Sequence, residues 1–87
     1  MIRILTADEP DALAITVDGR LVGEYVKEVE TCVQRAIEEK KKIRVFLRNV
    51  TDIDDIGRSL LLRLAAQDIE LSASGVYSAY VVAGLGR

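Results

Sequence analysis

The segment formed by residues 43–64 changes its hydrophobic period from two residues to about 3.6 residues. Residues 43–48 alternate apolar and more polar side chains, which is typical of a strand, and a leucine-rich stretch with helical spacing follows. The polar stretch between them contains Asp52, Asp54, Asp55 and Gly57. A strand that leads through a short polar loop into a helix is a common position for the functional surface of an α/β domain. We therefore expect this loop to carry the function.

The rest of the chain repeats this change between strand-like and helix-like segments. Period-two patterns predict further strands at residues 1–6, 12–18 and 69–73. Helical spacing predicts helices at residues 23–41, 55–66 and 76–83. Pro10 and its acidic neighbours predict a turn over residues 7–11, and Gly19 and Gly23 bracket a second loop. The predicted order is β-β-α-β-α-β-α, with the first two strands antiparallel because their connection is short.

Two strand–helix–strand connections of the usual right hand place both helices on one face when the strands progress steadily across the sheet. A sheet covered on both faces would show continuous apolar runs, whereas these strands alternate. We therefore predict one domain over residues 1–87 with an α/β fold, a single-layer mixed four-stranded sheet with helices packed on one face. The open face would carry Thr16, Asp18, Arg44, Arg48, Glu70 and Ser72. Phe46 lies among them, either shielded by the arginine stems or serving as a contact site.

Composition excludes several classes of function. The chain has no histidine, which removes zinc sites and serine–histidine or cysteine–histidine nucleophile pairs. Its net charge of −2 argues against nucleic acid as the main partner. No apolar run approaches the ~20 residues needed to cross a bilayer, and the single cysteine, Cys32, suits a reducing, cytoplasmic compartment. We expect no catalytic activity, no cofactor and no direct membrane insertion.

The three aspartates of the loop allow two interpretations. Asp54 or Asp55 is placed to cap the leucine-rich helix by accepting hydrogen bonds from its first N–H groups. Three carboxylates exceed what capping needs, and paired carboxylates also hold Mg²⁺, as in aspartyl-phosphate receiver domains. Such a domain would need a lysine after a later strand, and the segment after residues 69–73 contains none. The helix cap is therefore the main interpretation and a metal site the alternative.

At this point the residues resemble a known family, the STAS domains. The family signature is an apolar strand, then Asp-Ser-Ser-Gly or Asp-Ser-x-Gly at a helix start, then a leucine-rich helix. Here IRVFLRNVTDI precedes Asp54-Asp55-Ile56-Gly57. VDGRLVGEYV is similar to the family's first helix start, and IELSASGVYSAYVVAGL to its last strand and helix, so the resemblance covers nearly the whole chain. The family includes anti-sigma factor antagonists and the cytoplasmic tails of sulphate transporters.

The resemblance implies roles for individual residues. Asp54 matches the motif aspartate and Gly57 the motif glycine, which would allow close approach of a partner backbone. Asp55 occupies the position of the serine that a partner kinase, which is also the anti-sigma factor, phosphorylates. A serine kinase cannot phosphorylate Asp55, so it is either a fixed charge that imitates phosphoserine or an N-cap in a member that lost the switch. Arg48 and Asp52 also depart from the family, which often has an acid and an apolar residue there.

The expected partner-binding surface lies on the loop and the following helix. It comprises Asp52, Asp54, Asp55, Gly57, Arg58 and Leu62. Leu62 widens the apolar arc of the helix beyond one core stripe. The leading hypothesis is a regulatory module that resembles an anti-sigma factor antagonist and binds an anti-sigma serine kinase. The alternative is a constitutively docked STAS subunit of a stress-signalling complex or a membrane transporter.

A few side chains outside this surface also receive predictions. Ser59 and Thr51 are nearby hydroxyls. We expect Ser59 to be a solvent-facing helix serine and Thr51 to be a hydrogen-bonding residue of the loop, and phosphorylation of either one is the alternative. Cys32 is expected in the core, together with the tyrosines at positions 77 and 80. Tyr25 would face the partner side. The lysines at positions 40–42 are expected in the last turn of the first helix, where cations are favoured, as a solvated end.

Overall fold

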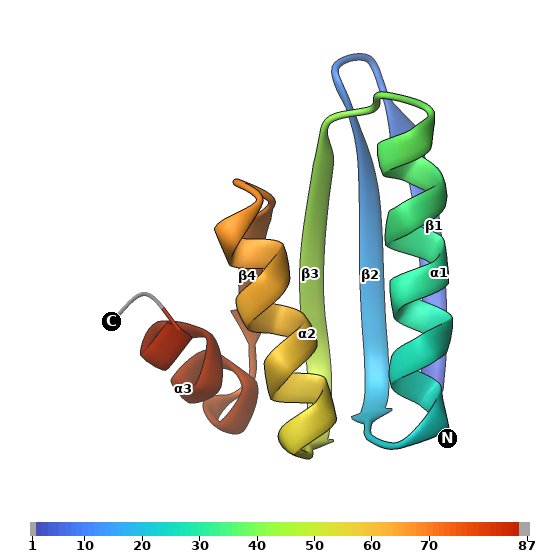
Figure 1. The fold of residues 1–87 in the computed structure, drawn as a ribbon. Coiled ribbons are helices and arrows are strands. Elements are labelled where there is room, and N and C mark those ends of the chain that lie inside the picture. Colours follow the sequence, from blue (N-terminus) through green and yellow to red (C-terminus); the bar gives the residue numbers. More distant parts are fainter. Residues whose placement is uncertain (1, 86–87) are drawn as a thin grey trace.

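Four strands form one mixed sheet in the spatial order β1-β2-β3-β4, and three helices follow the strands in the chain (Figure 1). The computed structural model describes residues 2–85, apart from the side chains of residues 76–78 and 85. The elements are β1 (Ile2–Glu9), β2 (Ala12–Leu21), α1 (Glu24–Glu38), β3 (Ile43–Ile53), α2 (Asp55–Ala66), β4 (Glu70–Ser74) and α3 (Val76–Leu85). β1 is antiparallel to β2, and β2, β3 and β4 are parallel. The predicted element order and fold class are confirmed.

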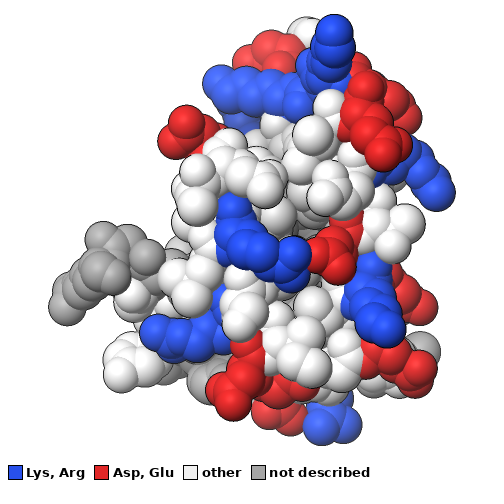
Figure 2. Space-filling model, viewed as in Figure 1, with Lys and Arg blue, Asp and Glu red and all other residues white. Residues whose placement is uncertain are grey.

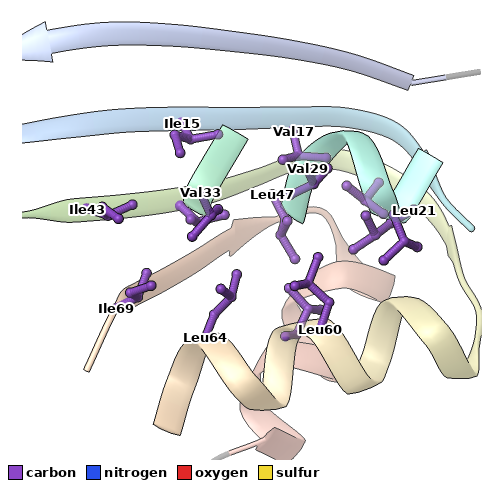
Figure 3. Packing of buried hydrophobic residues seen from close by; sticks show 14 of the residues in the cluster. Ile15, Val17, Leu21, Val29, Val33, Ile43, Leu47, Leu60, Leu64 and Ile69 are labelled. Atoms are coloured by element: carbon purple, nitrogen blue, oxygen red, sulfur yellow. The ribbon is translucent and has the colours of Figure 1, made fainter. Parts of the chain in front are cut away.

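The hydrophobic core lies between the sheet and the helices on one face of it. Figure 3 shows side chains of β2 and β3 pointing toward those of α1, α2 and the residue before β4. They include Ile15, Val17 and Leu21 from β2, Ile43 and Leu47 from β3, Val29 and Val33 from α1, Leu60 and Leu64 from α2, and Ile69. The inward positions predicted from the alternation of residues 12–18 and 43–48 therefore form the core. The opposite face of the sheet has no helix on it within the described residues (Figure 1).

β2 and β3 continue beyond their predicted ends. The sequence predicted the third strand to end at residue 48, where the alternation breaks. In the structure the strand continues, and Leu47 and Val50 are both buried although they are three positions apart. A β-bulge accounts for the break. Register shifts flank Gly19 of β2, which has a φ of 113°, and Asn49 of β3 has a φ of 53°. β3 has one extra residue on each side of Val50, which places Val50 opposite Gly19 and Ile53 opposite Leu21. Gly19, predicted to open a loop, therefore lies inside β2.

Boundaries at the other end of the sheet also differ from the prediction. β1 runs through the acids that were predicted to form a turn, and the turn is confined to Pro10 and Asp11 (Met1 lies outside the described residues). The helix α1 ends at Glu38, so the three lysines follow the helix and are not part of its last turn. Lys40 has a φ of 59°, a left-handed conformation that ends the helix. Lys41 pairs with Asp8 at 3.1 Å, which joins this end of α1 to β1.

The open face of the sheet carries the polar side chains predicted for it, arranged around Phe46. Arg44 and Arg48 lie two positions away from Phe46 on either side along β3. The Arg44 guanidinium contacts Glu9 at 3.2 Å and Glu70 at 3.5 Å, so it reaches across the strand to both sides. Arg48 pairs with Asp18 at 3.2 Å. Phe46 is half-buried between these arginines, which agrees with shielding by their stems.

The last helix is packed differently from the prediction. Its residue Val81 belongs to the core, but Tyr80 is 79% exposed, so the prediction that Tyr80 is a core residue is wrong. Neighbouring positions on a helix point about 100° apart, and the valine rather than the tyrosine faces the sheet. The Tyr77 side chain lies outside the described residues. Cys32 is half-buried against the core, as expected.

Two adjacent leucines of α2 test which side of this helix stabilises the fold. Leu61 is fully buried and Leu62 is 44% exposed. We expect Leu61→Ala to lower the free energy of unfolding by about 2–5 kcal/mol, because the cavity adds to the lost burial. Leu62→Ala should change it by less than about 0.5 kcal/mol. Urea unfolding followed by circular dichroism measures both, and equal effects would contradict the packing described here.

Candidate functional site

Two strand–helix connections meet at the end of the sheet where β2 and β3 finish. β2 and β3 are parallel neighbours, so the starts of α1 and α2 lie side by side beyond their carboxyl ends (Figure 1). The backbone N–H of Asp54 donates to the carbonyl of Leu21 at 3.4 Å, which links the two connections directly. The carboxyl ends of parallel strands are the usual position of binding sites in open α/β sheets. The predicted site residues lie here and on the first turns of α2.

The carboxylate of Asp54 holds both connections together. Its Oδ1 accepts a hydrogen bond from the backbone N–H of Gly57 at 2.8 Å, which makes Asp54 the N-cap of α2. Its Oδ2 accepts from the backbone N–H of Gly23 at 2.8 Å, at the start of α1. These bonds, first from Gly57 and then from Gly23, lower the pKa of Asp54 because they favour the charged form. The sequence left open which aspartate caps the helix, and the structure assigns the cap to Asp54.

Gly57 is buried under this cap and has a structural reason to be glycine. A Cβ placed on it would collide with the backbone carbonyl of Leu21 and would lie 3.2 Å from a side-chain carbon of Ile53. The prediction that Gly57 receives the backbone of a partner is therefore corrected. The backbone that approaches it belongs to this chain, and it allows α2 to begin close against β2.

Asp52 lies in β3 and not in a loop, because the strand continues to Ile53. Its neighbour across the parallel pair is Arg20, and the two side chains form an ion pair at 3.2 Å. Both side chains are more than half exposed, so the pair lies at the surface beside the site. The three aspartates thus have separate surroundings. Asp52 pairs with an arginine, Asp54 caps α2 and accepts a hydrogen bond from the residue before α1, and Asp55 is exposed on the first turn of α2.

The exposed side of α2 presents charged and apolar side chains together. With about 100° between successive residues, Asp55, Ser59 and Leu62 point directly away from the buried side. Arg58 is exposed at one flank of this line and Ile56, which is 56% exposed, at the other. We call the set Asp55, Ile56, Arg58, Ser59 and Leu62 the α2 surface. The predicted exposure of Leu62 is confirmed, and Figure 2 shows acidic side chains gathered where α2 begins.

The arrangement does not favour the metal alternative. Within residues 2–85, no group of three Asp, Glu or Cys side chains is placed to hold a metal ion. The Asp54 carboxylate already accepts two backbone hydrogen bonds, and Asp52 is drawn to Arg20. Asp55 is the acid of the three whose carboxylate has no recorded hydrogen bond or ion pair with another described residue.

Comparison with known proteins assigns no family to this chain. A scan against protein-family models finds no match, and a search of curated proteins finds no relative. None of the helices in the described part of the chain is long and apolar enough to cross a bilayer.

Two features of the site were missed by the sequence reasoning. One is the bond from Gly23 to Asp54, which parallel pairing of the second and third strands could have suggested, since their ends must meet. The other is Ile56, whose exposure follows from its place on a helix that buries Gly57, Leu60 and Leu64. A helical projection would have shown that Ile56 lies on the flank of the outward line.

A glycine pair tests the close contact at the start of α2. We expect Gly57→Ala to lower the free energy of unfolding by about 1–3 kcal/mol, because the new methyl group displaces packed backbone. Gly84→Ala in α3 is the control, since a Cβ there meets nothing within 4 Å. It should be neutral or stabilising by up to about 1 kcal/mol. Thermal or urea unfolding compares the two, and a harmless Gly57→Ala would contradict the contact.

Neighbouring aspartates test the helix cap. At neutral pH, Asp54→Ala should destabilise the protein more than Asp55→Ala, because it leaves two backbone N–H groups without an acceptor. The folded pKa of Asp54 is lowered from its ordinary value of 3.8, so its contribution is complete above that pH. The contribution is lost as the pH falls through the folded pKa. The difference in free energy of unfolding between wild type and Asp54→Ala should therefore become smaller below about pH 4. A difference that stays constant down to pH 2 would contradict the assignment of the cap to Asp54.

Proposed function

We propose that this protein is a non-catalytic regulatory module that binds a protein partner through the α2 surface, in the manner of an anti-sigma factor antagonist. The observation that supports the proposal most directly is the division of tasks between two adjacent aspartates. Asp54 is committed to its own fold by two backbone hydrogen bonds, and Asp55 is exposed beside it. A first turn that is capped by Asp54 and presents the charge of Asp55 outward suits recognition by another protein.

The composition of the α2 surface also suits a protein interface. Ile56 and Leu62 are two of the large apolar side chains that the described residues leave exposed. Apolar side chains of this size are the usual anchors of an interface, and charged neighbours such as Asp55 and Arg58 set the orientation of the partner. Over the helix-covered side as a whole, acidic and basic side chains are interleaved (Figure 2). This mixture does not resemble the basic stripe of a nucleic-acid-binding protein.

Asp55 would act in this proposal as a permanent negative charge at the serine position of the family motif. The first turn of a helix favours an anion, so the charge is compatible with the fold. An aspartate carries one unit of charge, against roughly 1.5–2 units for phosphoserine at neutral pH, and fewer acceptor oxygens. It would therefore imitate the phosphorylated state in part, and a kinase surface that accepts neutral serine would bind this chain weakly.

The surroundings of Cys32 agree with a cytoplasmic module. The thiol is unpaired and half-buried in the described structure. Burial raises its pKa, and the nearby Arg35 offsets this only in part, so little reactive thiolate forms at neutral pH. We propose a cytoplasmic location and a structural role for this cysteine.

The proposal is tested at Asp55 with serine-kinase-type anti-sigma factors encoded in the same genome as the protein. We expect Asp55→Ser and Asp55→Asn each to bind the kinase about tenfold more tightly than wild type, a difference of about 1.4 kcal/mol. Calorimetric titration measures the affinities. With ATP and Mg²⁺, Asp55→Ser should gain one phosphate and lose the added affinity, whereas Asp55→Asn should do neither.

A variant at Leu62 distinguishes the location of the binding surface from the role of the charge at Asp55. Leu62→Asp should abolish binding in every Asp55 background, because it places a charge at the apolar anchor. Affinity that is the same for Asp, Ser and Asn at position 55, yet lost with Leu62→Asp, would refute the imitation. It would favour a constitutively docked subunit of a stress-signalling complex or transporter. Binding that survives Leu62→Asp would overturn the α2 surface itself.

A further inference from the structure

β1 is an outer strand whose far edge has no neighbour among the described residues. The sheet order begins with β1, and only its β2 side is paired. The strand is 8 residues long and contains no proline or bulge. Proteins usually protect such an edge because its free N–H and C=O groups attract another strand. The other outer strand, β4, has only 5 residues, so β1 is the longer of the two edges.

The side chains of β1 are divided between the two faces of the sheet by its pairing with β2. Ile2 and Ile4 pack against the core on the helix side. The alternate residues Arg3, Leu5, Ala7 and Glu9 pair with open-face positions of β2. Leu5 is 45% exposed, a large apolar side chain beside an unpaired edge.

The β1 sequence is complementary to itself when two copies run antiparallel. With Thr6 opposite Thr6 of a second copy, every pair of facing residues has numbers that add to twelve. On the open face, Arg3 then lies opposite Glu9 and Leu5 opposite Ala7, and the twofold axis repeats both pairs. Shifting the axis to Leu5 places Arg3 opposite Ala7 and leaves no pair of opposite charges. Shifting it to Ala7 places Leu5 opposite Glu9.

Arg3 and Glu9 are both able to form this ion pair between two copies. Arg3 is exposed and has no recorded ion pair with another described residue, since the nearby Asp18 is engaged by Arg48. Glu9 accepts a hydrogen bond from Arg44 through Oε1 at 3.2 Å. A carboxylate has a second oxygen, so Oε2 can accept from an arginine of the other copy.

The helix side of the edge contains one acid, Asp8, which would face Ile4 of the second copy. Lys41 of its own chain holds this carboxylate at 3.1 Å, so its charge is offset before any dimer forms. The acid therefore does not block the approach of a second strand.

We propose that two copies of this chain associate through the β1 edges, antiparallel about Thr6, to form a continuous eight-stranded sheet. The twofold axis runs perpendicular to the sheet, so the helices of both copies, and with them the two α2 surfaces, lie on the same side of the eight-stranded sheet. A strand of 8 residues is a small interface, compared with about 20–30 residues a side in a stable complex. The dimer should therefore dissociate on dilution.

Reciprocal charge reversal tests both the dimer and its register. Sedimentation velocity over a dilution series should show a reversible monomer–dimer equilibrium for wild type. Arg3→Glu and Glu9→Arg should each raise the dissociation constant about tenfold or more, because each alone faces like charges across both symmetric pairs. An equimolar mixture of the two variants should dimerise again. In the mixed dimer, the introduced glutamate faces the introduced arginine in one pair, and the unchanged Glu9 and Arg3 face each other in the other pair. Rescue on mixing also shows that both variants are folded.

A second variant covers the case in which charge reversal disturbs the fold. Thr6→Lys changes an exposed side chain and places two ammonium groups across the axis, so it should give a monomer with unchanged circular dichroism. Wild type that stays monomeric up to millimolar concentration would overturn the proposal. A dimer that persists in Thr6→Lys, or single variants that are not rescued by mixing, would overturn the β1 interface. The outcome is independent of partner binding at the α2 surface.

Discussion

One carboxylate joins the starts of two helices to the same end of the sheet. Asp54 accepts from Gly57 at the first turn of α2 and from Gly23 at the first residue before α1. Gly23, the N-cap residue of α1, has no side chain with which to cap that helix, and its own backbone N–H is satisfied by the connection that leads into α2. A helix start leaves its first N–H groups without partners, and satisfying them here also fixes the distance between α1 and α2. The exposed position of Asp55 depends on this arrangement.

The helix-covered face and the open face of the sheet contribute differently to the stability of the fold. The buried side chains lie between the sheet and the helices, where burial of each large apolar residue is worth about 1.5–3 kcal/mol. The open face is held by ion pairs such as Arg48 with Asp18, which are partly exposed and worth about 0–1 kcal/mol each. Stability is therefore concentrated on one side of the sheet. The other side can accept polar changes at little cost, which leaves it available for contacts with other molecules.

The sequence was sufficient for features that depend on local periodicity. The alternation around Ile15 and Val45 identified the core face, and the bounds of α2 were predicted to the residue, because an aspartate cap and a leucine stripe mark both its start and its buried side. It failed where pairing between strands overrides the local pattern. The bulge at Asn49 interrupts the alternation although β3 continues, and β1 continues through Asp8 because β2 pairs with it.

The same limit explains the errors in the site. Asp52 was placed in a loop because the strand was thought to end early, and its partner Arg20 lies on another strand. Tyr80 was expected inside because a helix that is apolar all round gives no periodic signal for its buried side. Asp54 and Asp55 are neighbours in the sequence, and the geometry at the end of β3 determines that Asp54 caps the helix and that Asp55 is exposed.

Gly57 changes how a motif of this kind should be interpreted. Its missing side chain makes room for the carbonyl of Leu21, so the residue records how the chain packs on itself. Chains collected by an Asp-x-x-Gly pattern of this kind would share a helix docked closely on a neighbouring strand, whatever each of them binds. Differences in binding would arise at the two variable positions between the fixed residues, here Asp55 and Ile56, where an exposed side chain can change without moving the backbone. For a small domain, this separates the residues that natural variation must keep from the two that it can change to select a partner.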